Sequence, residues 1–297
     1  MADNSIVMKS KQTTHAAARQ TTMKVFGYTF TYVFLILVAI VVLFPFYWMI
    51  ISSLKTTDEY RLSTPTLWPN FIRWDNYVDA FSQANLWRLF GNTAFVGIVS
   101  TILSLVITIL AAFAFARLEF KGKNILFAAL LATMMIPGEL FTITNYITVA
   151  QMKMLNTYSV LIIPFLVSVF YIYLLRQNFM QIPNELYYAA EVDGTSDFKY
   201  LLKVMIPLAL PTIITITILK MMGAWNSYVW PRLVANDAAH QLVSNGLRNA
   251  FTVAETGKTN YPVQMAAVVL VSLPLFLVFV FLRKYIMKGV SRSGIKG

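Results

Sequence analysis

Residues 182–211 read IPNELYYAAEVDGTSDFKYLLKVMIPLALP, a polar stretch that interrupts an otherwise hydrophobic polypeptide. We predict two short helices here, separated at Gly194, because glycine adopts left-handed dihedral angles cheaply and commonly ends a helix. Asn184 is predicted to cap the first helix and Ser196 the second. Apolar runs on both sides place this helical pair between two membrane spans, where it is suited to docking and to transmitting motion. An amphipathic helix lying on the lipid surface is the alternative.

The composition places the chain among membrane proteins. Of its 297 residues, 58% are hydrophobic and 12% are charged, which is too apolar for a soluble domain. Backbone groups in lipid need internal hydrogen bonds, so apolar runs of about 20 residues are predicted to be helices. The fold class is therefore all-α, an integral membrane protein with six transmembrane helices. The six runs are residues 28–50, 93–115, 125–143, 158–175, 206–228 and 263–282.

Prolines fall in or at the ends of these runs, and each removes a backbone donor and favours a bend. Bent helices are common where a pathway must open and close, although proline is frequent in membrane helices generally. The prolines concerned are Pro45, Pro137, Pro164, Pro207, Pro211 and Pro274.

The distribution of positive charge predicts the topology. Of the 24 Lys and Arg residues, 15 lie in segments that are cytoplasmic if the N-terminus is inside, and 8 lie in the outside segments. Because positive residues concentrate on the cytoplasmic side, we predict that both termini are inside. The chain then divides into a cytoplasmic N-terminal tail (1–27), a six-helix transmembrane domain (28–282) with a cytoplasmic loop (182–207), and a cytoplasmic C-terminal tail (283–297). The same distribution argues against a nucleic-acid partner, and the long first run is predicted to be an uncleaved span.

The residue types that carry most enzyme chemistry are missing or scattered. The chain has no cysteine and two histidines, His15 and His240, which fall on opposite sides of the membrane by this topology. We therefore predict no catalytic residues and no metal site. Residues 257–259 read GKT, but Thr252 stands where a phosphate loop requires glycine. ATP must then be handled by another chain.

Two ionisable residues lie within predicted spans, where charge is costly and usually functional. Glu139 and Lys220 each lie 14 residues into their runs, so straight helices would place them at a similar depth. They are expected either to pair or to face a watery pathway. Near them, Asn145 and Asn226 offer amides that suit a sugar, while Trp225 and Tyr228 either stack on a sugar ring or anchor the helix end, which we favour.

Several motifs together resemble one family. AAEVDGTS followed by IPLALP is similar to the EAA loop of ATP-binding-cassette (ABC) importer permeases, whose pattern is EAA, three residues, Gly, then a span with proline. From residue 28 to 297 the chain resembles the carbohydrate branch, specifically subunits similar to the second permease of the maltose importer. The supporting motifs are FPFYWMIISSLK (44–55), ARLEFKGKN (116–124), MMIPGEL (134–140), LNTYSVLIIP (155–164), WNSYVWP (225–231) and KGVSRSGIKG (288–297).

The resemblance implies a type I importer permease in a bacterial cytoplasmic (inner) membrane. Such a subunit forms half of a pore with a homologous second permease. It receives a sugar from an extracytoplasmic solute-binding protein. Two cytoplasmic ATPase subunits bind ATP and Mg, so no cofactor is expected in this chain. The EAA helices dock on an ATPase and carry its closure into the spans, which drives alternating access.

The resemblance also assigns coupling roles within the loop. Ala189, Ala190, Asp193 and Gly194 match the family pattern, whereas Tyr188 stands where the family has Glu. Glu185 and Glu191 are the two neighbouring glutamates that could take its place. The predicted coupling residues are Glu185, Tyr188, Ala189, Ala190, Asp193, Gly194 and Pro207.

These features favour a transport subunit that is not itself an enzyme. A stand-alone secondary transporter is the alternative, and it predicts inverted repeats and paired acidic residues within the spans. The spans hold one acid, Glu139, and no repeat is evident.

Overall fold

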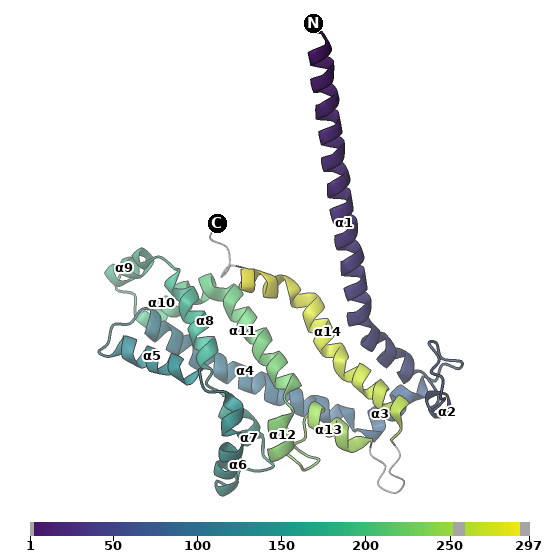
Figure 1. Ribbon diagram of the computed structural model, residues 1–297. Coiled ribbons are helices and arrows are strands. Elements are labelled where there is room, and N and C mark those ends of the chain that lie inside the picture. The colour runs from purple at the N-terminus through teal and green to yellow at the C-terminus, as the bar shows by residue number, and fades with distance from the viewer. Residues whose placement is uncertain (1–2, 252–258, 292–297) are drawn as a thin grey trace.

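The computed structural model describes residues 3–251 and 259–291, and its regular elements there are helices, which confirms the all-α prediction (Figure 1). Within these described ranges, four helices are long and apolar enough to cross a membrane, and the number of possible spans is six if each of two bent helix pairs forms one span. The four are α1 (Asp3–Ser53), α4 (Leu86–Ala116), α11 (Ile206–Asn226) and α14 (Tyr261–Ser291). The bent pairs are α5 (Lys123–Thr133) with η1 (Gly138–Phe141) and α6 (Thr142–Gln151), and α7 (Tyr158–Ile162) with η2 (Ile163–Phe165) and α8 (Val169–Met180).

Short helices connect these spans. At the end of the bundle where α4 ends lie α9 (Asn184–Val192) and α10 (Asp197–Tyr200), which continues through the π-helical turn η3 (Leu201–Met205) into α11 (Figure 1). The remaining short helices are α2 (Thr57–Tyr60), α3 (Asp75–Gln83), α12 (Val229–Val234) and α13 (Val243–Ala250).

The first helix is longer than predicted. Residues 3–27, expected as a tail, belong to α1, and the helix runs on past residue 50 to Ser53. No proline lies between Asp3 and Gly27 to end the helix. In Figure 1 α1 extends well beyond the other helices. Its apolar part is only 6% buried by this chain, so its outer surface is available to lipid or another subunit.

The third predicted span is broken at a proline. α5 and the η1–α6 segment meet at 81°, at residues 134–137. Pro137 has extended dihedral angles (φ −58°, ψ 127°) and cannot continue the hydrogen bonding of α5. The fourth span bends by 46° near Pro164, and Ser168 then caps α8 by accepting a hydrogen bond from the Tyr171 amide. Both breaks agree with the predicted effect of proline.

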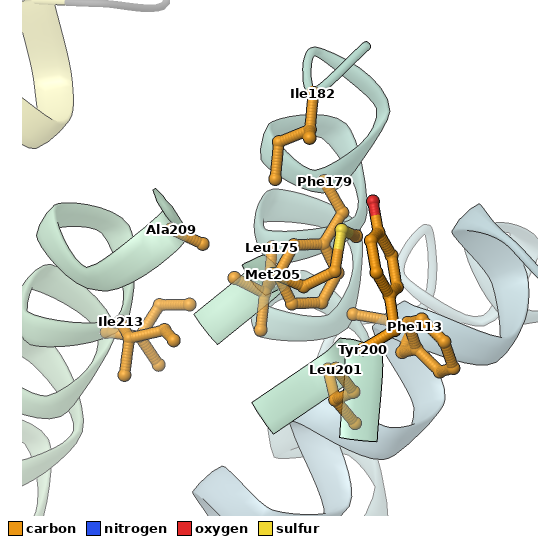
Figure 2. Packing of buried hydrophobic residues seen from close by; sticks show 11 residues of the cluster. Phe113, Leu175, Phe179, Ile182, Tyr200, Leu201, Met205, Ala209 and Ile213 are labelled. Atoms are coloured by element: carbon orange, nitrogen blue, oxygen red, sulfur yellow. The ribbon is translucent and has the colours of Figure 1, made fainter. Parts of the chain in front are cut away.

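One hydrophobic core lies at the end of the bundle that carries the loop between α8 and α11. It is built by α4, α8 and the start of α11. Side chains of α10 and η3 insert between these helices, as Figure 2 shows for Tyr200, Leu201 and Met205. Tyr200 and Met205 are no more than 1% exposed. Removing such apolar surface from solvent contributes about 1.5–3 kcal/mol for each large side chain, so this end of the loop is firmly seated. The other members of the cluster include Phe113, Leu175, Phe179, Ile182, Ala209 and Ile213.

Candidate functional site

The loop between α8 and α11 has the predicted two-helix form. α9 ends next to Gly194, whose φ of +67° is the left-handed conformation expected there. Ser196 occupies the N-cap position of α10, as predicted, although its side chain makes no capping hydrogen bond. The predicted cap at Asn184 is wrong, because α9 begins at this residue and its side-chain oxygen instead accepts a hydrogen bond from Arg117.

The loop presents apolar side chains away from the bundle. No residue of α9 is buried, and Val192 is 88% exposed. We call Leu186, Tyr188, Val192 and Phe198 the exposed apolar set of the loop; each is at least 44% exposed. This chain therefore leaves apolar surface of the loop uncovered.

The predicted coupling residues occupy this exposed region, with two exceptions. Ala190 is half-buried against the core cluster. Pro207 lies in the first turn of α11, directly after the π-helical turn. A proline has no N–H to donate to the carbonyl four residues earlier, and its ring crowds that carbonyl. For Pro207 this carbonyl lies within the π-helical turn, which is wider than an α-helical turn. The exposed members are Glu185, Tyr188, Ala189, Asp193 and Gly194.

A residue that the sequence analysis did not single out holds the two loop helices together. The hydroxyl of Tyr187 donates to Asp197 Oδ1 at 2.8 Å, and its ring packs edge-on against Tyr200 at 5.1 Å. The hydrogen bond to Asp197 is the main cause that raises the pKa of Tyr187 to about 12, followed by burial. The hydrogen bond and the ring contact connect α9 to α10.

A cavity of about 390 Å³ lies where α4, α8, α11 and α12 meet. Its walls are mainly apolar, but five side chains bring polar groups to it: Ser100, Ser168, Tyr171, Lys220 and Ser227. A largely apolar cavity with a few convergent polar groups is the usual form of a small-molecule site. Of the predicted pathway residues, Lys220 lines this cavity.

Of the two alternatives for Glu139 and Lys220, a pair or a watery pathway, the pair does not form among the described residues. The ammonium of Lys220 donates to the backbone carbonyl of Phe165, in the break between α7 and α8. Glu139 lies in η1, beyond the 81° bend, and it is exposed. The prediction that Glu139 and Lys220 lie at a similar depth failed because it treated residues 125–143 as one straight helix.

The other predicted pathway residues are not among those that line the cavity. Trp225 is buried and stacks on Phe90 at 5.9 Å between ring centroids, and its anchoring role stays a prediction. The Asn226 amide donates to the carbonyl of Met222 at 3.0 Å, and the Tyr228 hydroxyl accepts from Arg232. Asn145 is exposed on α6.

Residues 104–292 match the model of one protein family, described as "Binding-protein-dependent transport system inner membrane component". The chain belongs to this family. It is thus a permease subunit of an ABC importer. This confirms the predicted family and the prediction that the chain is a transport subunit and not an enzyme. A location in a membrane follows from the same membership.

Relatives and a solved structure agree. The permease is 29% identical to the arabinooligosaccharides transport system permease protein AraQ of Halalkalibacterium halodurans, over 88% of this chain and 93% of the relative. It is 28% identical to the diacetylchitobiose uptake system permease protein NgcG of Streptomyces coelicolor (87% and 86%). It is 30% identical to the probable ABC transporter permease protein MG189 of Mycoplasma genitalium (87% and 85%).

The crystal structure of a bacterial ABC transporter involved in import of the acidic polysaccharide alginate contains a chain with the same fold. The TM-score is 0.80 at 23% identity, over 88% of this permease and 96% of that chain. The type I importer fold is therefore confirmed, and the alternative of a stand-alone secondary transporter is set aside.

Because Lys220 and Glu139 do not touch, their replacements are expected to act independently. Lys220→Met removes the donor to the Phe165 carbonyl and takes the ammonium from the cavity wall, so it is expected to lower uptake several-fold. Glu139→Gln, at an exposed site, is expected to have a smaller effect. Uptake rates of both single variants and the double variant form the test. Recovery in the double variant would contradict independence.

Proposed function

We propose that this permease moves a sugar or oligosaccharide across a bacterial cytoplasmic membrane by alternating access. Relatives named for arabinooligosaccharide and diacetylchitobiose uptake support a carbohydrate cargo. The polar groups around the cavity, Ser100, Ser168, Ser227, Tyr171 and Lys220, suit hydroxyl-rich ligands. The permease works with a homologous second permease and an extracytoplasmic solute-binding protein.

The exposed apolar set of the coupling loop is the observation that carries the mechanism. We assign this surface to contact with a cytoplasmic ATPase subunit, one of two in the complex. The loop continues without interruption through η3 into α11, which carries Lys220 to the cavity. Movement imposed on the loop would therefore reach the cavity along one helix. ATP and Mg are bound by the ATPase subunits in this scheme.

Purification of the tagged permease from its native membranes tests this function. We expect a second permease and an ATPase to co-purify, and the reconstituted complex to take up labelled oligosaccharides, tested as a panel, only when ATP is supplied. The matched control replaces ATP by ADP. Uptake by the permease alone, driven by an ion gradient, would contradict the proposal.

The topology with both termini inside is open to a labelling test, because the chain contains no cysteine. Lys121→Cys lies in the exposed turn between α4 and α5, and Ser63→Cys lies in the exposed loop between α2 and α3. Lys258, which the predicted topology places on the outer side of the membrane, is not among the described residues. An impermeant maleimide added to intact cells should label position 63 and reach position 121 only after permeabilisation. The reverse pattern would overturn the topology.

A further inference from the structure

The ends of α4 and α8 are joined by two arginines, one from each helix. Arg117 follows the last residue of α4 and is only 8% exposed. Its guanidinium donates to the carbonyl of Phe179, at 2.8 Å, in the last turn of α8, and to the carbonyl of Ile182, just after that helix. The other terminal nitrogen donates to the side-chain oxygen of Asn184, the first residue of α9. One side chain thus connects α4, α8 and the coupling loop.

The second arginine makes the reverse connection. Arg176 of α8 donates from Nε to the carbonyl of Phe115, at the end of α4, at 3.0 Å. Its guanidinium also lies over the ring of Phe127 in α5, at 4.0 Å from the centroid. The last carbonyls of each helix therefore accept hydrogen bonds from an arginine of the other helix.

These contacts depend on backbone position. The last four carbonyls of a helix have no partner within it, and they form the negative end of the helix dipole, which favours a cation. In the ion pairs that the described residues form, neither Arg117 nor Arg176 takes part. Backbone carbonyls accept hydrogen bonds from both guanidinium groups, and Arg117 also donates to the Asn184 side chain. A shift of the end of α8 or the start of α9 must therefore move Arg117 or break its hydrogen bonds.

We propose that Arg117 is a positioning residue that carries movement of α9 into α4. This step rests on the proposed function, in which an ATPase moves the coupling loop. Arg117 lies at one end of α4, and Ser100 of the same helix lines the cavity. α4 then forms a second connection from loop to cavity, beside the one through α11. A planar guanidinium suits this role because it reaches three acceptors with a fixed geometry, which an ammonium does not.

The test measures helix movement and assembly separately, in the intact complex in lipid nanodiscs. Spin labels at Trp87→Cys, exposed near the start of α4, and Val229→Cys, exposed on α12, report the distance across the other end of the bundle. We expect a change in this distance when ATP and vanadate are added. In Arg117→Gln the change should fall at least threefold, while ATPase co-purification and ATP hydrolysis stay within twofold. Arg117→Lys should be intermediate.

Lys121→Gln is the matched control, since it removes an exposed cation from the same turn and should leave the distance change intact. If Arg117→Gln fails to assemble, Asn184→Ala replaces it; this variant keeps both carbonyl acceptors and should reduce the change partially. A full distance change in an assembled Arg117→Gln or Asn184→Ala complex would overturn the inference. Failure of the unmodified permease to bind an ATPase would overturn the proposed function instead.

Discussion

Gly194→Trp is expected to abolish ATP-driven uptake while the permease still inserts into the membrane. The residue has a φ of +67°, which costs a residue with a side chain about 1–2 kcal/mol. Among the residues that the structure describes, and apart from the two chain neighbours, no atom lies within 4 Å of the position that a Cβ would occupy here, so this part of the permease has room for a side chain. A bulky indole would instead occupy the space at which the proposed ATPase contact forms.

Gly194→Asn is the matched control for this variant, because asparagine tolerates left-handed dihedral angles better than other residues. It should retain most of the uptake, whereas Gly194→Trp should fall to background at equal membrane abundance. Uptake in proteoliposomes and ATPase co-purification are the two measurements. Normal uptake by Gly194→Trp would contradict the proposed ATPase contact at the Gly194 end of α9.

Val192→Asp is expected to detach the ATPase and to reduce uptake at least tenfold. Val192 is 88% exposed, so an aspartate costs the isolated permease little stability. In a closed protein contact the same carboxylate would be buried without a partner, and a penalty of about 1.4 kcal/mol already corresponds to a tenfold loss of affinity. Val192→Leu keeps the surface apolar and should bind normally. Equal co-purification of both variants would place the ATPase elsewhere.

The sequence was sufficient for those features that depend on local chemistry. Apolar length predicted the spans, the left-handed preference of glycine predicted the conformation of Gly194, and proline predicted the bends near Pro137 and Pro164. The coupling loop could be identified because its polar residues interrupt an apolar chain. Lys220 lines the cavity, and its role in a substrate pathway stays a prediction.

Contacts between helices could not be predicted in the same way, because they depend on bend angles and helix rotation. The direction of the chain after Pro137 decides where Glu139 lies, and proline fixes the existence of a bend but not its 81° angle. Arg117 looked like one more cytoplasmic cation, since its acceptors lie more than 60 residues away in the sequence. The Asn184 side chain was assigned to a cap for the same reason.

The π-helical turn at Leu201–Met205 has a consequence for length variation among related permeases. Such a turn absorbs one additional residue without rotating the helix that follows it. A relative that lacks one residue in this turn would therefore still direct Lys220 toward the cavity. Loss of one residue from the regular turns between 206 and 220 would rotate Lys220 by roughly 100° about the axis of α11, since a turn holds about 3.6 residues. We expect insertions and deletions to be confined to residues 201–205 and to be absent from the segment that follows.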